Sequence, residues 1–251
     1  MVERHSTITL PPLPFSSMRS RYSFFHRLLD LIAPSACFCC GRRLAQQERF
    51  ICVACQRHLP YTNHHLTPDD NEMVRLLWLR IPVNNAAALY RHMPHAQSAR
   101  IIYDIKYHHQ PELARYMGQL MAQTFLQNSF FNSVTAIVPI PLTQQRQRTR
   151  GYNQSLLIAE GIAQVTQLPL QPTWIERTAF SKSQTHLSHA ERAENVEDAF
   201  CSNTHDDLTK QHILLVDDVI TTGATICAAA KALMRAGATQ FSVATLCFAK
   251  V

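Results

Sequence analysis

The run from residue 213 to residue 225 constrains the fold of this chain more than any other segment. It begins with four apolar residues, Ile213 to Val216, which predict a strand buried on both faces of a parallel sheet. Asp217 and Asp218 follow where this strand is expected to leave the sheet, and small hydroxylated residues lead into a helix that starts near Thr225. This order predicts an α/β domain with a ligand at the carboxyl end of its sheet.

The turn in this run has the composition of a phosphate site. Free N–H groups at the start of the next helix, with the positive end of its dipole, favour a phosphate monoester. Gly223 lets the backbone come close to that phosphate, and neighbouring hydroxyl groups add donors. The predicted binding segment is Thr221, Thr222, Gly223, Ala224 and Thr225.

The two acids predict a sugar beside the phosphate. Carboxylates that faced the phosphate would repel it, so Asp217 and Asp218 are expected to accept from ribose hydroxyls or to hold magnesium through water. An ordinary helix cap would need only one Asp and one Thr. The run therefore indicates a ligand site, with Asp217 and Asp218 as candidate catalytic residues.

Roughly the C-terminal two thirds of the chain has the rhythm of a mostly parallel sheet with helical crossovers, since apolar strand candidates alternate with amphipathic helix candidates from Asn85 onward. In chain order we expect a strand at 86–90, helices at 96–107 and 112–126, a strand at 134–140, a helix at 152–165, a strand at 213–216, a helix at 222–236 and a strand at 241–248.

A cluster of cysteines precedes this domain. Cys37, Cys40, Cys52 and Cys55 follow the spacing C-x2-C-x11-C-x2-C. A two-residue gap lets both thiolates of a knuckle face one ion, and two knuckles complete the tetrahedral sulfur shell that zinc favours. Four thiolates without a water position indicate a structural zinc site, whereas a pair of disulfides is the alternative for a secreted chain.

The remaining cysteines and the paired histidines are not expected to bind metal. Cys39 fits neither knuckle, and small core residues are expected at Cys201, Cys227 and Cys247. Surface positions are expected for His64, His65, His108 and His109.

Length and composition allow one main domain with a small module beside it. The chain has 251 residues, 46% of them hydrophobic, and a formal net charge of +6, which suits anionic ligands or nucleic acid without requiring either. No apolar stretch predicts a membrane span or a signal peptide, so a cytoplasmic location is expected.

The chain is expected to divide into four parts. These are a tail with a short amphipathic helix at 1–33, a zinc module at 34–60, a connector with one short helix at 61–84 and the α/β domain at 85–251. Met18 is an alternative start of the chain.

The run 213–225 resembles the phosphoribosyl-pyrophosphate (PRPP) signature of type I phosphoribosyltransferases, and with the cysteines the chain resembles the ComF family, also called GntX-like or competence protein F. The other matching segments are Lys106-Tyr107; Val138-Pro139-Ile140-Pro141; Arg148, Arg150, Gly151, Tyr152, Asn153 and Gln154; and Gln184, Leu187, Arg192, Asn195 and Phe200. Tyr152 replaces the usual Phe, and His108-His109 replaces a frequent Gly.

The resemblance implies a phosphoribosyltransferase-type fold that binds PRPP with magnesium and serves DNA uptake, competence or DNA utilisation. It also implies single-stranded DNA or a competence helicase as a partner, and subunit pairing is common in this fold class. Catalysis stays open: the chain could be an active salvage-type phosphoribosyltransferase or a PRPP-sensing regulator. No segment shows a recognisable pocket of aromatics and amides that would read an acceptor base.

Basic residues near the site have several interpretations. Arg148 and Arg150 lie in a segment, 144–150, that could cradle pyrophosphate, contact nucleic acid through its phosphates, or form an ordinary solvated loop. Lys106 becomes a candidate contact through the resemblance alone. Asn153 and Gln154 could cap the following helix or contact ligand. Arg177, Lys182 and Arg192 bracket Gln184 in a segment expected to cover the site as a hood.

Overall fold

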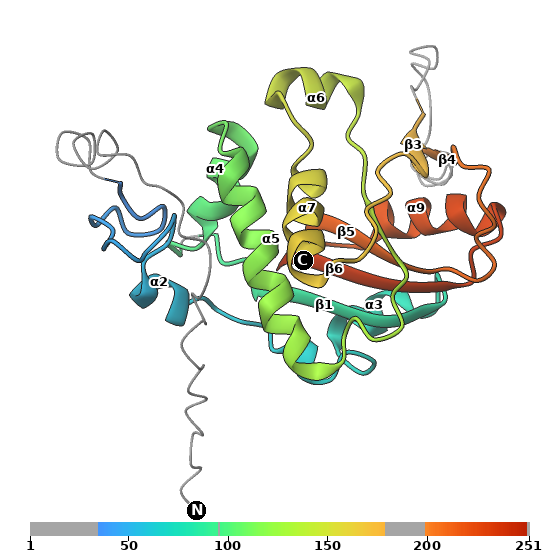
Figure 1. Cartoon of the computed structure of the whole chain (residues 1–251), viewed down its shortest axis with the longest axis horizontal. Coiled ribbons are helices and arrows are strands. Elements are labelled where there is room, and N and C mark those ends of the chain that lie inside the picture. The colour runs from blue at the N-terminus through green and yellow to red at the C-terminus, as the bar shows by residue number, and fades with distance from the viewer. Residues whose placement is uncertain (1–34, 95, 179–198, 250–251) are drawn as a thin grey trace, which may run out of the picture. The chain divides into compact units, whose positions relative to one another are not determined.

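A four-stranded parallel sheet forms the centre of the computed structural model, which describes residues 35–94, 96–178 and 199–249 (Figure 1). From Ala36 on, these residues belong to one compact unit. The strand order is β1-β6-β5-β2, with β1 at Val83–Arg91, β6 at Gln240–Phe248, β5 at His212–Ile220 and β2 at Ala136–Pro139. The expectation of a parallel sheet flanked by helices is confirmed.

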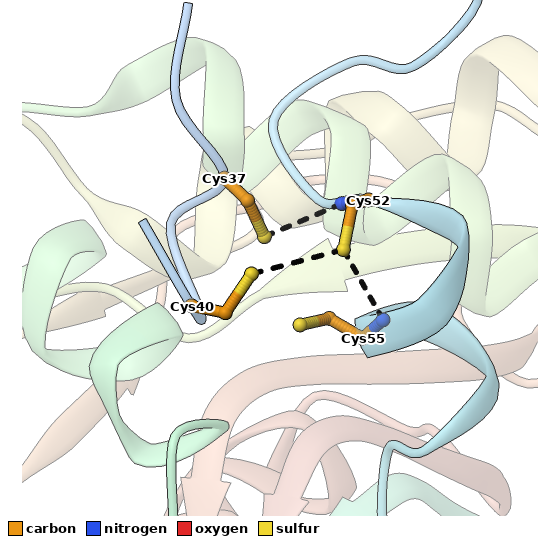
Figure 2. Close-up of side chains that lie close together, drawn as sticks. All are labelled: Cys37, Cys40, Cys52 and Cys55. Carbon is orange, nitrogen blue, oxygen red and sulfur yellow. Dashed lines mark hydrogen bonds between the residues drawn. The ribbon is translucent and has the colours of Figure 1, made fainter. Parts of the chain in front are cut away.

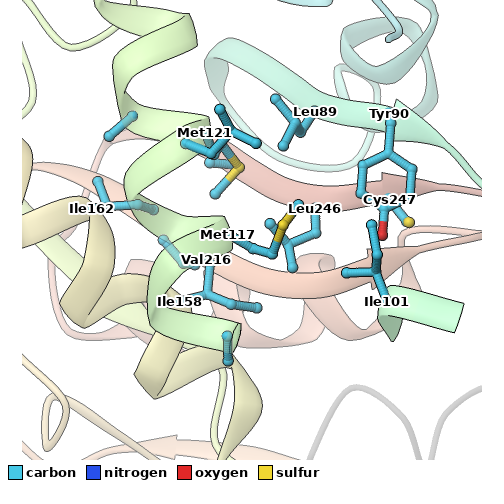
Figure 3. Packing of buried hydrophobic residues seen from close by; sticks show 14 of the residues in the cluster. Leu89, Tyr90, Ile101, Met117, Met121, Ile158, Ile162, Val216, Leu246 and Cys247 are labelled. Atoms are coloured by element: carbon cyan, nitrogen blue, oxygen red, sulfur yellow. The ribbon is translucent and has the colours of Figure 1, made fainter. Parts of the chain in front are cut away.

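Helices cover both faces of the sheet because successive strand residues point to opposite sides. Leu214 and Val216 face the core shared with α4 (Ala99–Tyr107), α5 (Pro111–Phe125) and α7 (Gln154–Thr166). Ile213 and Leu215 face the core shared with α3 (Glu72–Leu77) and α9 (Ala224–Arg235). Figure 3 shows the first core, in which Met117, Met121, Ile158 and Ile162 lie near Val216 and Leu246 of the sheet.

Two glycines let α5 and α7 pack backbone to backbone. A Cβ atom on Gly118 would lie 2.1 Å from the carbonyl oxygen of Ile158, and one on Gly161 would lie 2.1 Å from the carbonyl oxygen of Arg115. Such distances leave no space for a side chain. This contact fixes the position of α7, whose first turn reaches the carboxyl end of β5.

The remaining helices and strands of the described residues are short, and the sequence did not predict them. They are α2 (Val53–Arg57), the short 3-10 helices η1 (His64–Leu66) and η2 (Leu126–Asn128), α6 (Gln144–Arg150), and the antiparallel pair of β3 (Ile175–Arg177) and β4 (Phe200–Ser202). Residues 144–150, expected as a loop, form the helix α6, which Thr143 caps at its start and Gly151 ends with φ 79°. The connector does contain a short helix, α3.

Several expectations about single residues need correction. His64 and His65 are buried, not at the surface, because their rings pack against Phe248 and Phe125. Burial lowers the pKa of both imidazoles. Cys201 is exposed because β4 is a short strand outside the main sheet. Cys227 and Cys247 are buried, and His108 and His109 are exposed, as expected.

Other expectations fall outside what can be described. The amphipathic helix and the tail in the first 33 residues lie outside the described residues, and so do Lys182, Gln184, Leu187, Arg192 and Asn195. Within the described part of the chain, no helix has the length and apolar character needed to cross a membrane.

Candidate functional site

Asp217 and Asp218 lie inside β5, not beyond its end as expected. The strand continues through Ile220 because its backbone keeps pairing with β6, where Asp217 is opposite Thr245 and Val219 is opposite Cys247. The two acids nevertheless lie at the carboxyl end of the sheet, since the shorter neighbour β2 stops at Pro139, opposite Val216. Residues of β5 after Val216 therefore have no β2 residue beside them, and their side chains lie next to the loops.

Each acid has a different partner. The Asp217 carboxylate accepts from the Ser155 hydroxyl, with Oγ and Oδ1 2.8 Å apart, and from the backbone N–H of Asp218 at 2.8 Å. Asp218 forms an ion pair with Lys106, whose Nζ lies 3.2 Å from its Oδ2. Lys106 belongs to α4, so α4, α7 and β5 meet at the two carboxylates.

Burial, together with the charge of Asp218, raises the pKa of Asp217 to about 7. The Ser155 hydrogen bond, the Asp218 N–H and the charge of Lys106 oppose this rise. A pair of adjacent carboxylates that repel one another favours added positive charge. The site therefore has the electrostatics of a place that takes a cation or polarised hydroxyl groups.

The loop after β5 presents an uncapped helix start. Gly223 is the N-cap residue of α9, has φ 72°, and offers no side chain to the first turn. Thr221 and Thr222 are exposed, and the Thr222 hydroxyl accepts weakly from Ala224 N at 3.4 Å. The segment Thr221 to Thr225 thus places N–H groups and hydroxyls at the N-terminus of a twelve-residue helix, an arrangement that suits an anion.

The connector supports this loop, a role that the sequence did not indicate. Arg80 donates from Nη1 to the carbonyl oxygen of Thr222 at 2.6 Å. A Cβ atom on Gly223 would lie 2.8 Å from Leu77 Cδ2, so α3 packs directly on the loop. The glycine is required both by its left-handed backbone and by this close approach.

The two predicted arginines lie in different surroundings. Arg150 is half-buried, donates to Gln154 Oε1 at 2.9 Å and lies 5.7 Å from the ring centre of Tyr107. Arg148 is exposed on α6. A third arginine, Arg177 on β3, lies 5.1 Å from the Phe200 ring. Burial lowers the pKa of Arg177, as does the charge of Arg146, while Asp217 raises it, so these charges share one region.

At the start of α7, Asn153 has the capping role that was one of its two expected roles. Asn153 is its N-cap residue: Oδ1 accepts from Ser155 N at 3.1 Å, and Nδ2 donates to the Ile140 carbonyl at 3.0 Å. The Asn153 side chain therefore caps α7 through Oδ1 and joins the helix start to the residue after β2 through Nδ2. Ser155, which contacts Asp217, carried no recognisable sequence signal, because a serine in a first helical turn is common.

A second candidate site lies among the four predicted cysteines. The sulfur atoms of Cys37, Cys40, Cys52 and Cys55 all lie within 4.8 Å of one another (Figure 2). The Sγ atoms of Cys40 and Cys52 are 3.9 Å apart. Zinc bonds of about 2.3 Å in a tetrahedron would place sulfurs roughly 3.8 Å apart, so the cluster fits a four-thiolate zinc site.

Backbone N–H groups prepare these sulfurs for a cation. Cys52 N donates to Cys37 Sγ, and Cys55 N donates to Cys52 Sγ, each at 3.3 Å. Although burial opposes the change, the Cys55 N–H and the Arg42 side chain lower the pKa of Cys52 to about 6. Cys39 is buried and lies outside the four-sulfur group, as expected.

The parallel sheet and the loop after β5 define a phosphoribosyltransferase-type domain. Residues 106–251 match the family model described as "Phosphoribosyl transferase domain". This match covers more than half of the 251 residues. It begins at Lys106 and therefore includes Ser155, both acids and the phosphate-type loop.

Curated relatives extend the likeness to most of the chain. "DNA utilization protein YhgH" of Escherichia coli is 27% identical over 232 residues, 86% of this chain and 98% of the relative. "Competence protein F" of Haemophilus influenzae is 33% identical over 43% of this chain and 48% of its own length. "Competence protein ComFC" of Bacillus subtilis is 25% identical over 84% of this chain and 83% of its own. The chain belongs to the phosphoribosyl transferase domain family and, within it, to the ComF family.

Proposed function

We propose that the carboxyl end of β5 binds PRPP or a related phosphoribosyl nucleotide together with magnesium, in a protein that acts in DNA uptake or DNA utilisation. The observation that carries the proposal is the meeting of two acids and an uncapped helix start on one short segment. The names of the relatives, which refer to competence and DNA utilisation, support the biological role.

Each part of the site has a chemical role in this proposal. The segment from Thr221 to Thr225 binds the 5′-phosphate through N–H and hydroxyl donors. Asp217 and Asp218 accept from the ribose hydroxyls and hold magnesium, which neutralises pyrophosphate charge when bound. Lys106 holds Asp218 in place, and Arg148 or Arg150 binds pyrophosphate or nucleic acid phosphates.

Calorimetry with the full chain tests the proposal. We expect heat of binding when PRPP is added with magnesium, and a loss of at least tenfold in affinity when Asp217→Asn is combined with Asp218→Asn. Asp69→Asn, an exposed acid in the connector, is the matched control and should bind as wild type does. A wild-type protein that binds no PRPP, or a double variant that binds it equally well, contradicts the proposal.

Pyrophosphate release separates the catalytic alternative from sensing. Release in the presence of any base in a panel makes the protein an active phosphoribosyltransferase. Tight binding without release supports a PRPP-responsive role, in which ligand alters affinity for single-stranded DNA, a helicase or a second subunit. DNA uptake by cells that carry the double variant then shows whether the bound ligand is needed for the biological role.

We further propose that the cysteine cluster holds one structural zinc ion in a module spanning 34–60, joined by the 61–84 connector to a domain at 85–251. Four cysteines that bind zinc must stay reduced, and this favours a reducing compartment, the cytoplasm. Elemental analysis should find about one zinc per chain, lost when Cys52→Ser is combined with Cys55→Ser. Cys201→Ser, which alters an exposed cysteine outside the cluster, should keep the metal.

A further inference from the structure

A carboxylate lies buried beside the two cysteine knuckles of the metal cluster. Glu48 belongs to the eleven-residue link between Cys40 and Cys52, and its side chain is only 7% exposed. The preceding residue, Gln47, is exposed. A buried carboxylate costs free energy unless donors surround it, so the Glu48 side chain needs partners within the fold.

Glu48 joins the two knuckles through hydrogen bonds. Its Oε2 accepts from the backbone N–H of Ala45, which follows the first knuckle, at 2.8 Å. Its Oε1 accepts from the N–H of Val53, the first residue of α2 and the neighbour of Cys52, at 2.8 Å. These N–H groups lower the pKa of Glu48, so the group carries its charge at neutral pH. One carboxylate therefore holds the chain after Cys40 against the chain after Cys52.

Arg42 adds a positive charge to this arrangement. Its Nη2 lies 2.5 Å from Glu48 Oε1, the oxygen that also accepts from Val53. The Arg42 side chain also interacts with Cys52, where its positive charge stabilises a thiolate. Arg42 therefore contacts both the buried carboxylate and one of the four candidate zinc ligands.

A four-thiolate zinc site depends on such neighbours. Four thiolates carry more negative charge than one Zn²⁺ ion removes, so positive groups and N–H donors around the sulfurs stabilise the loaded cluster. The backbone N–H groups of Cys52 and Cys55 supply two of these donors. Partners that orient the ligands also decide how tightly the ion is held, and loss of one typically lowers metal affinity about 10- to 100-fold.

From these contacts we infer that Glu48 and Arg42 are positioning residues of the cysteine cluster and determine its affinity for zinc. Glu48 holds the two knuckles together, and Arg42 offsets negative charge at Cys52. An ordinary surface ion pair contributes little, but here one partner is buried and accepts two backbone N–H groups. The inference rests on the proposed zinc site, because both residues act through its ligands.

Competition with a chromogenic chelator, on the zinc-loaded full chain, tests the role of Glu48. Glu48→Gln keeps the shape of the side chain but removes its charge and replaces one acceptor by a donor. Zinc binding should weaken about tenfold or more. Gln47→Ala, at the exposed neighbouring position, is the matched control and should bind zinc as the wild type does.

Arg42→Met tests the charge separately, since both N–H groups can still donate to Glu48. Zinc binding should weaken roughly threefold to tenfold. Arg42→Lys keeps the charge and should recover most of the affinity. Arg57→Met, which removes an exposed positive charge from α2, is the matched control. If it weakens zinc binding as much as Arg42→Met does, net charge decides the affinity and the role of Arg42 is refuted.

Cobalt(II) in place of zinc distinguishes positioning from simple stabilisation, because its visible absorption reports the geometry of the ligands. Glu48→Gln should change the tetrahedral spectrum that the wild type and Gln47→Ala share. A variant that melts at a lower temperature but keeps the zinc affinity and the spectrum would mean that the pair only stabilises the fold, and the inference would be wrong while the zinc site stands. If the wild type binds neither ion, the proposed zinc site itself fails.

Discussion

At the scale of single residues, the site is held together by contacts across the fold. Ser155 on α7 donates to Asp217, and Lys106 on α4 pairs with Asp218. Neither Ser155 nor Lys106 lies within the segment 213–225, which is the segment that predicts the ligand. Each acid therefore depends on a separate helix for its position and charge, and the site exists only after both helices have packed on the sheet.

Replacing Asp217 by Asn should stabilise the protein at neutral pH while weakening PRPP binding. Burial and the charge of Asp218 raise the pKa of Asp217 to about 7, above its value of about 3.9 in an unfolded chain. Because the folded protein holds the Asp217 proton more tightly than the unfolded chain does, its contribution to stability is complete below about pH 3.9, the pKa in the unfolded chain. This contribution is lost as the pH rises through about 7, the pKa in the folded protein. The gain from Asp217→Asn should grow between about pH 4 and about pH 7, to at most about 4 kcal/mol, and then level off.

Chemical unfolding of both proteins across this pH range, without ligand, measures the effect. Asp69→Asn serves as the control, because the exposed side chain of Asp69 has nothing to gain from neutralisation. A stability difference between wild type and Asp217→Asn that does not change with pH would show that Asp217 has an ordinary pKa.

Local chemistry in the sequence predicts some of these residues and misses others. The acids, the threonines and Gly223 stand in one run, so their grouping was predictable, and so was the cysteine cluster. Ser155 and Arg80 contact partners far along the chain, Asp217 and Thr222, and nothing near them in sequence signals these contacts. The burial of His64 and His65 was mispredicted for the same reason, because Phe248 and Phe125 cover them only in the folded chain.

At the scale of elements, α3 holds the phosphate-type loop in its conformation. Arg80→Met removes the hydrogen bond to the Thr222 carbonyl and should weaken PRPP binding roughly threefold to tenfold. The unfolding free energy should change little because Arg80 is exposed. Arg75→Met, on α3 shortly before Arg80 and paired with Asp70, is the matched control and should bind normally. Equal affinity in both variants would rule out support of the loop by Arg80.

The contact between α5 and α7 should not tolerate a side chain. Gly161→Ala would place its Cβ 2.1 Å from the Arg115 carbonyl oxygen and should destabilise the protein by about 1–3 kcal/mol. Gln123→Ala, at an exposed position of α5, should change stability by less than about 0.5 kcal/mol. Thermal unfolding of the two variants measures the difference, and an unaffected Gly161→Ala would mean that the helices can separate freely.

Elements with strong apolar periodicity were predicted within a few residues of their observed bounds. The helix expected at 112–126 is Pro111–Phe125, and the strand expected at 241–248 is Gln240–Phe248. Helix α6 was missed because its residues bury no apolar face. Strands β3 and β4 were missed because each has three residues, too few to show alternation.

At the scale of the whole molecule, the cysteine segment is part of the main core. Ile51 and Cys52 are buried in the same cluster as Met117 of α5 and Leu246 of β6. A zinc ion bound by the four cysteines would therefore stabilise more than the segment itself.

Removal of the metal should lower the stability of the whole unit. A strong chelator is expected to reduce the melting temperature by several degrees and to keep a single transition, because one core spans both regions. Calorimetry with and without chelator, with Cys201→Ser as the control, measures this. Two separate transitions, with the larger one unchanged, would show that the cysteine segment unfolds alone.

Phosphorus NMR of PRPP tests the central claim most directly, since its 5′-phosphate and pyrophosphate give separate resonances. With magnesium and wild-type protein, the 5′-phosphate resonance should shift or broaden. Gly223→Ala should abolish this change, because the new side chain would meet Leu77 and the left-handed backbone would be strained. A 5′-phosphate resonance that stays unchanged at saturating wild-type protein would contradict phosphate binding by the loop from Thr221 to Thr225.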